Sequence, residues 1–392
     1  MDKPAATSWD FAAIRTGLHT ARGLRDASWL AESQRCPHDF AEALLTAPEL
    51  SPPLLRKSAL DIGIDFYSDL LGAHAQSQNG ARKVIEYFDT EPRSLSYREL
   101  HTQATVLAMH FAAHRLIPGG KLALVLPLGV ELLIALLAGL RLGLHLGIVV
   151  PMGPRQIARQ LQALGKAPIW TLPRYQRLLG EHTGRVIPRS RQDERLRATV
   201  ESSVLESHTY QPLDPVLSCF SPLHADPDTL IEVPAQRAYV GGLRDSLVLE
   251  LRPGATLWAP LAHPAQHGVA LLFAVLHAGA TYIHHPAVES GHAPPWPWSG
   301  SPDVLFLSGA ALPLAGALSF PTGGPRRFFL CPFAAQTPRL LSTIADGPLG
   351  KIPGSLLHLD TAAGGAILIS EPRAGTLSHA VFPAPGVRYQ VE

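Results

Sequence analysis

The chain has 392 residues, of which 46% are hydrophobic and 17% charged, and its mean hydropathy is +0.11. This composition predicts a globular protein with a sizeable core and excludes an intrinsically disordered chain. The formal net charge of +1 offers no strongly basic surface, so we expect no nucleic-acid partner.

The first part of the chain is expected to form a helical extension and then to alternate helices with strands. Ser96 stands three residues before Glu99 and ahead of an apolar-periodic run, a pattern typical of a capping box at the start of a helix. We expect helices over residues 66–74, 96–114, 130–142 and 154–164, and extended segments over residues 83–88, 122–126, 147–150 and 168–172.

The stretch over residues 122–151 is long and apolar enough to raise the question of a membrane span. It contains Glu131 and Arg141, however, and Pro127 interrupts it early. Since a charged side chain in the middle of a bilayer costs several kcal/mol, we favour a buried strand, helix and strand, and predict that the protein does not span a membrane.

The pattern weakens between residues 180 and 228, where residues 185–197 hold five arginines and are interpreted as a solvated linker or surface helix. Order then returns at residues 247–251. We expect strands over residues 256–259, 281–284, 304–307 and 327–330, helices over 268–279 and 312–318, a Pro/Trp-rich loop over 292–302, and short strands over 350–392.

Strands that alternate with helices at this spacing predict parallel β-α-β units. We therefore predict an α/β fold of stacked, mostly parallel sheets with flanking helices and a small β-rich tail. The expected division is a helical extension over 1–60, a first α/β subdomain over 61–225, a second over 226–345, and the tail over 346–392.

The cysteines Cys36, Cys219 and Cys331 are far apart, and no C-x-x-C motif occurs. This pattern favours neither a disulfide framework nor a zinc ribbon, and it is typical of a reduced compartment. The N-terminus lacks the apolar core of a signal peptide. We expect a cytoplasmic protein, and the scarcity of lysine beside abundant Ala, Leu, Pro and Gly suggests a bacterial source with a GC-rich genome.

Several segments resemble, in order, the sequence blocks of the adenylate-forming superfamily, the AMP-dependent synthetases and ligases that include acyl-CoA synthetases and adenylation domains. They are SLSYREL with PGGKLALVLPLGVELLIALLAGLRLG (94–143), RPGATLWAPLAHPAQHGVALLFAVLHAGATYI (252–283), DVLFLSGAALP (303–313) and GPLGKIPGSLLHLDTAAGGAILIS (347–370). The resemblance covers roughly residues 60 to 370 and implies the large N-terminal domain of that fold.

Members of this superfamily use ATP to convert a carboxylate into an acyl adenylate, and then pass the acyl group to coenzyme A or to a carrier-protein thiol. The chemistry needs a donor-rich loop for the triphosphate, a Mg²⁺ ligand and a cation for the developing charge. The resemblance therefore implies an acyl or aryl carboxylate as ligand, and an acyl carrier protein or a partner enzyme as the protein partner.

The resemblance also points to a set of pocket residues. His263 falls at the histidine of the family's "PLFH" block beside the carboxylate pocket, and His267 follows four residues later. A metal site at HPAQH is disfavoured, because Pro264 weakens a helix there and no HExxH glutamate is present. The remaining candidates are the adenine-flanking Ser308, Gly309, Ala310 and Ala311, and the Phe333, Gln336 and Thr337 of a "YGxTE"-like turn.

Much of the family's ATP machinery is not recognisable. The expected position of the phosphate loop, residues 226–246, holds only Thr229, Ser246 and the pair Gly241-Gly242 in place of a Ser/Thr/Gly run ending in Pro-Lys. The string TGGPRR (322–327) lies in the wrong place and is interpreted as an ordinary turn. Gln336 replaces the Mg²⁺-binding carboxylate.

The end of the sequence adds to this pattern. We find neither the ribose-binding aspartate expected after residues 365–370 nor the mobile C-terminal domain with its catalytic lysine, since Lys351 is the last lysine. No catalytic residue can be assigned, and no metal site is predicted.

Three functional hypotheses stay open. The first is a divergent ligase-like protein with impaired ATP chemistry that binds an acyl or aryl carboxylate, or its thioester, in a lipid, polyketide or pigment pathway. The second is an active ligase with an atypical ATP site, which would require ATP and Mg²⁺ as cofactors. The third is a non-catalytic interaction or scaffold protein.

Overall fold

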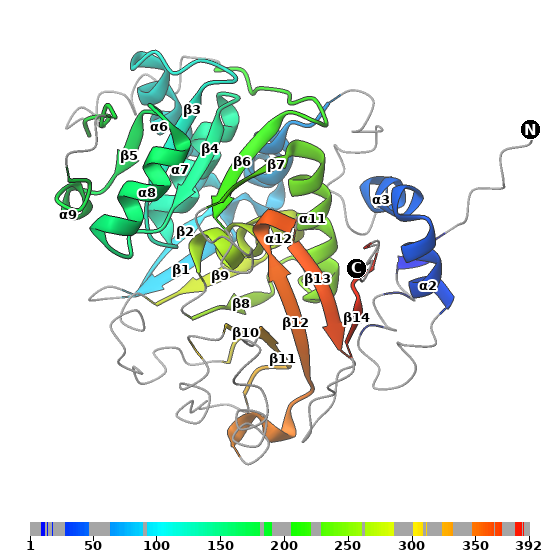
Figure 1. Ribbon diagram of the computed structural model, residues 1–392. Helices are drawn as coiled ribbons and strands as arrows, with labels where there is room; N and C mark the ends of the chain where they lie inside the picture. Colours follow the sequence, from blue (N-terminus) through cyan, green and yellow to red (C-terminus); the bar gives the residue numbers. More distant parts are fainter. Residues whose placement is uncertain are drawn as a thin grey trace, which may run out of the picture.

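The computed structural model describes most of the chain between Trp9 and Val387, and its strands form two sheets (Figure 1). The described residues are 9–11, 14, 18, 28–46, 63–88, 92–180, 184–189, 205–220, 229–260, 263–285, 301–308, 311, 324–331, 347–363, 365–370, 381–385 and 387.

The smaller sheet has five strands among the described residues, in the order β5-β3-β4-β6-β7. Its first four strands are parallel to their neighbours, and β7 is antiparallel to β6. The strands are β3 (Lys121–Val125), β4 (His145–Val149), β5 (Ile169–Thr171), β6 (Pro215–Phe220) and β7 (Leu230–Pro234).

The larger sheet has nine described strands, in the order β14-β13-β12-β11-β10-β8-β9-β1-β2. Its central strands run parallel, and β2, β13 and β14 pair antiparallel at the two ends. The strands are β1 (Lys83–Phe88), β2 (Pro92–Ser96), β8 (Thr256–Trp258), β9 (Thr281–His284), β10 (Val304–Ser308), β11 (Arg327–Cys331), β12 (Gly354–Asp360), β13 (Gly365–Ser370) and β14 (Val381–Pro383).

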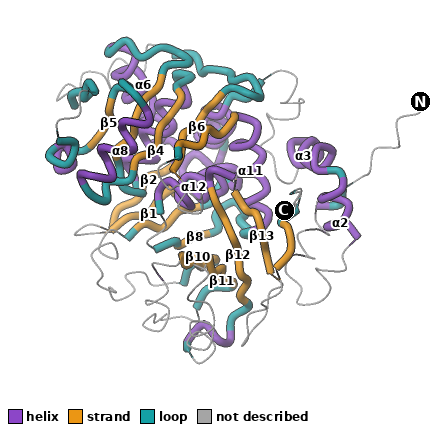
Figure 2. Tube along the Cα trace, in the orientation of Figure 1, coloured by secondary structure: helices purple, strands orange, loops and turns teal. Residues whose placement is uncertain are grey.

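Helices flank these sheets and also lie between them (Figure 2). The α-helices are α2 (Ser28–Arg35), α3 (Pro37–Thr46), α5 (Ala73–Gln76), α6 (Tyr97–Ala113), α7 (Val130–Arg141), α8 (Pro154–Leu164), α9 (Pro173–Gln176), α11 (Ala235–Val248) and α12 (Val269–Ala278). The π-helical turns are η1 (Ser68–Gly72) and η3 (Pro264–Gly268), and the 3-10 turns are η2 (Gln78–Ala81), η6 (Pro348–Lys351) and η7 (Thr361–Ala363).

Local sequence signals place several of these elements. The Ser96 hydroxyl accepts a hydrogen bond from the Glu99 backbone N–H at 3.2 Å, and the Glu99 carboxylate accepts one from the Ser96 N–H at 2.7 Å. The predicted capping box is therefore confirmed. The apolar stretch 122–151 forms β3, α7 and β4, as expected, and no described helix is both long and apolar enough to cross a bilayer.

The two sheets are joined through a central layer that contains α11, η3 and α12. Helix α11 contacts β6 of the smaller sheet and β13 of the larger, and η3 contacts β4 and β6 on one side and β12 on the other. All ten residues of α12 are buried. A helix that is buried on every side is stable only when other elements surround it, so α12 requires both layers.

The prediction of stacked, mostly parallel sheets with flanking helices is confirmed, but three elements were missed. β6 lies in the stretch 180–228 where the sequence pattern is weak, and β7 and α11 follow it, between residues 230 and 248, where no such element was expected. β7 has only five residues, and the N-cap of α11 is Pro234, which offers no side-chain cap, so neither element carries a strong local signal.

The structure also corrects the expected place of a phosphate loop. Residues 230–248 form β7 and α11, and Gly241 and Gly242 lie buried inside that helix. A Cβ built on Gly242 would come within 2.7 Å of the His277 ring and 2.9 Å of the Phe273 Cβ. Gly242 therefore serves close packing of α11 against α12 and does not belong to a loop.

The order of the strands within the two sheets differs from their order along the chain. β1 and β2 join the larger sheet although they precede the smaller one in sequence, β7 joins the smaller sheet, and β12 to β14 continue the larger sheet. The division into units at residues 60, 225 and 345 stays a prediction about the chain.

We predict that Gly242→Ala lowers the free energy of unfolding, because His277 and Phe273 must move to admit the methyl group. Overpacking costs roughly 1–3 kcal/mol, more than the gain of up to about 1 kcal/mol in helix propensity. Gly72→Ala is the matched control, since its nearest neighbours would lie at 3.7 and 3.9 Å. Urea unfolding should show a lower free energy of unfolding for Gly242→Ala than for Gly72→Ala. An equal change in the two variants would contradict the close packing of Gly242 against α12.

Candidate functional site

The turn that follows β8 brings His263 to the start of the buried helix. His263 is the N-cap of η3, and its Nδ1 accepts a hydrogen bond from the Gln266 backbone N–H at 3.1 Å. The expectation that Pro264 would weaken a helix here is wrong. Pro264 occupies the first helical position, where the missing N–H has no intrahelical partner to lose.

His267 lies one turn further on and contacts the large sheet. Its side chain is 1% exposed, its Nε2 is 3.5 Å from the Cys331 Sγ, and its ring centroid is 5.5 Å from that of Phe306. Cys331 ends β11 and pairs in register with Ser308, which ends β10. Because parallel strands end at one edge of the sheet, His267, Ser308 and Cys331 meet at the carboxyl edge, where open α/β folds bind ligands.

A hydroxyl from the turn after β12 fixes the junction between η3 and α12. The Thr361 Oγ1 donates a hydrogen bond to the Gln266 carbonyl at 3.0 Å and accepts one from the Ala270 N–H at 3.3 Å. Both backbone groups lie where the π-helical turn changes into an α-helix. Thr361 thus secures the segment that carries His267.

The side chains at this edge are uncharged at neutral pH. Burial lowers the pKa of His263 to about 4 and that of His267 to about 3, and burial raises the pKa of the Cys331 thiol to about 11. The His267 Nδ1 has no hydrogen-bond partner among the described residues. The buried side chains at this edge are therefore neutral, and one imidazole nitrogen has no partner among the described residues.

The structure tests the placement of only some of the predicted pocket residues. His263, His267 and Ser308 lie in the turn and strand end described above, and Ala311 is buried. Gly309, Ala310, Phe333, Gln336 and Thr337 lie outside the described residues, so their roles stay predictions. Sequence reasoning missed Gln266, which stands just before the predicted helix 268–279, and Thr361, which lies in the segment 350–392 where short strands were expected.

Two further candidates are a phosphate site at TGGPRR (322–327) and a metal site. The Arg326 side chain of TGGPRR pairs with Asp303 at 2.9 Å, and that of Arg327 pairs with Glu250 at 2.6 Å. These contacts agree with the interpretation of TGGPRR as a turn. In the part of the chain that the structure describes, no three His, Cys, Asp or Glu side chains gather closely enough to hold a metal ion.

Comparison with known proteins gives matches to solved structures only. No family model and no curated protein matches this sequence. The N-terminal subdomain of NpsA from Klebsiella oxytoca in complex with 3-hydroxyanthranilyl-AMSN is similar with a TM-score of 0.60 at 19% identity, over 78% of this chain and 75% of that chain.

Two longer proteins are also similar. NpsA-ThdA, an artificially fused adenylation-PCP di-domain from Klebsiella oxytoca, gives a TM-score of 0.60 at 18% identity over 81% of this chain. The fatty acyl-adenylate ligase from L. pneumophila in complex with acyl adenylate and pyrophosphate gives 0.62 at 11% identity over 79% of this chain. This chain spans 57% of the length of each.

The chain therefore has the fold of the N-terminal subdomain of adenylation domains, and the predicted resemblance to the adenylate-forming superfamily is confirmed at the level of the fold. At these identities the comparison establishes the architecture only. The ligand and the reaction must be inferred from the residues of this chain.

We predict that His267 makes the protein sensitive to acid. Its pKa is about 3 in the folded protein against 6.5 unfolded, so stability is full above pH 6.5 and falls as the pH drops toward 3. At about pH 5 the protonation of His267 should have lowered the free energy of unfolding by roughly 2 kcal/mol. His267→Leu should reduce the loss of unfolding free energy between about pH 7.5 and 5, measured in urea.

The control for this experiment is His38→Gln, which changes an exposed histidine. An unchanged pH dependence in His267→Leu would show that His267 is not held neutral by burial.

Proposed function

We propose that this protein is a divergent ligase-like protein that binds an acyl or aryl carboxylate, or its thioester, at the carboxyl edge of β10 and β11. The observation that carries this proposal is the contact between His267 and Cys331, which joins the start of the buried helix to the strand ends. A ligand pocket in an open α/β fold is expected between such elements.

The electrostatics of this edge favour the uncharged portion of such a ligand. His263 and His267 are neutral because burial lowers the pKa of both, and Phe306 adds an aromatic ring beside His267. A neutral, largely apolar lining suits an alkyl chain or an aromatic ring, and the free His267 nitrogen suits a single hydroxyl or amino substituent. Two of the similar solved structures hold an acyl or aryl adenylate group or its analogue.

We further propose that the ATP chemistry is impaired. β6 is a parallel strand of the smaller sheet, and the segment between it and β7 (221–228) reads Ser-Pro-Leu-His-Ala-Asp-Pro-Asp. It contains no glycine and no lysine but two aspartates. A triphosphate needs closely approaching N–H donors and cations, so two carboxylates at this position oppose its binding.

The partner proposed on the same grounds is a carrier protein or an enzyme that supplies or accepts the acyl thioester, in the cytoplasm of a bacterium. An active carboxylate ligase with an atypical ATP site is the second candidate function, since the architecture is that of adenylation domains. In that case ATP and Mg²⁺ would bind to groups other than those of the family's phosphate loop.

The test is calorimetry with a panel of fatty and aryl acids and with Mg²⁺-ATP, followed by pyrophosphate release. We expect an acid to bind to the wild type and to His38→Trp but not to His267→Trp, because the larger indole must displace Cys331 and Phe306, the neighbours of the His267 ring. We also expect no heat from ATP at millimolar concentration and no acid-dependent pyrophosphate. Acid-dependent release would replace the impaired-ligase proposal by the active one, and absence of acid binding would remove both.

A second prediction concerns the acidic segment alone. If its carboxylates oppose the triphosphate, Asp226→Asn combined with Asp228→Asn should strengthen ATP binding by about tenfold, because two negative charges that repel the triphosphate are removed. Fluorescent ATP-analogue titration measures this, with Asp214→Asn on the turn before β6 as the control. An unchanged affinity would mean that these aspartates are not what excludes ATP.

A further inference from the structure

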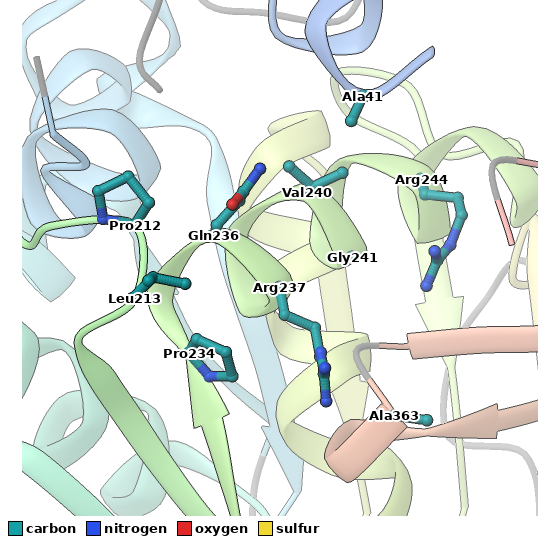
Figure 3. Close-up of a pocket in the computed structure, with 10 residues that line it drawn as sticks. All are labelled: Ala41, Pro212, Leu213, Pro234, Gln236, Arg237, Val240, Gly241, Arg244 and Ala363. Atoms are coloured by element: carbon teal, nitrogen blue, oxygen red, sulfur yellow. The ribbon is translucent and has the colours of Figure 1, made fainter. Parts of the chain in front are cut away.

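A pocket of about 310 Å³ lies on the side of α11 that faces α3, and no residue of β10 or β11 lines it (Figure 3). Its lining combines apolar side chains with two guanidinium groups and contains no acidic residue. The lining consists of Ala41, Pro212, Leu213, Pro234, Gln236, Arg237, Val240, Gly241, Arg244 and Ala363.

We propose that this pocket binds a small amphipathic anion, a molecule with a carboxylate or phosphate head and an apolar body. The proposal is independent of the function proposed above, because the two sites share no residue.

The helix itself builds the cationic wall. Arg237 and Arg244 are seven residues apart on α11, which places them on one face and about 10 Å apart along the axis. Figure 3 shows both side chains extending to the same side of the helix, toward the turn that carries Ala363. Gly241 lies between them on that face and has no side chain, which leaves room for a ligand between the two arginines.

The two arginines differ in how much of their charge is available. Arg237 is exposed, and no hydrogen bond or ion pair joins it to another described residue. Arg244 is largely buried, with its Nε 3.9 Å from the Asp245 Oδ1. That same oxygen accepts a hydrogen bond from the Ala366 N–H at 2.8 Å, so the carboxylate is directed toward β13. Arg237 is therefore the principal ligand for an anionic head, with bidentate geometry available.

The other wall supplies the apolar contact. Leu213 is 82% exposed, one of the largest exposures of any apolar side chain in the described chain, and Pro212 and Pro234 flank it. Gln236 also lines the pocket, and its amide can bond a polar group of the ligand. The volume is at the lower end of the range of small-molecule pockets, so a ligand with a body of roughly eight carbons suits it better than a nucleotide.

The experiment compares three probes that share one body: octanoate, octyl phosphate and octanol, titrated by calorimetry against the full chain. We expect at least one of the anions to bind, and octanol to bind about tenfold or more weakly than that anion, because it cannot pair with a guanidinium. The tighter of the two anions identifies the head group as carboxylate or phosphate.

Variants assign the binding to this pocket. Arg237→Gln should weaken the bound anion about tenfold or more, and Leu213→Ser should weaken it by a smaller factor, whereas Arg155→Gln, an exposed arginine on α8, should have no effect. Both pocket side chains are exposed, so these variants should keep the unfolding midpoint of the wild type.

His267→Trp separates this site from the one proposed above and should leave the binding of the anion unchanged. Binding that is lost in His267→Trp but kept in Arg237→Gln would overturn the proposal, as would equal affinity for octanol or no binding of either anion.

Discussion

The burial of α12 is the constraint on which the rest of the structure depends. Each of its ten residues is buried, so the helix has no side that can face water. It is enclosed because α11 and η3 contact strands of both sheets. The same enclosure forces the preceding turn against the carboxyl edge of the large sheet, and this brings His267 to Cys331. The core and the candidate site thus have one physical cause.

Enclosure also sets the electrostatics of the interior. His267 and His277 lie in or beside α12, and burial lowers the pKa of each to about 3. Asp245 is buried as well, and burial raises its pKa to about 7. Burial therefore favours the neutral form of these three groups, whereas the buried Arg327 is paired with Glu250.

The turn η7 links the two sites that we propose. Thr361, its first residue, bonds the junction of η3 and α12, and Ala363, its last, lines the pocket between the two arginines of α11. Helix α11 separates the two sites, with Gly242 packed against α12 and Gly241 open to the pocket. Helix α11 therefore packs against the core on one side and lines the pocket with its two arginines on the other.

The sequence alone determined the features that depend on near neighbours. The capping box at Ser96 and Glu99, the strand-helix-strand of residues 122–151 and the α/β class follow from periodicity and cap chemistry. Tertiary structure decided the rest. β7 and α11 carry weak local signals and are stabilised by neighbours far along the chain, and His267 meets Cys331 across 64 residues. Such contacts depend on how the sheets stack and on which strand lies beside which, and neither is encoded in any short stretch of sequence.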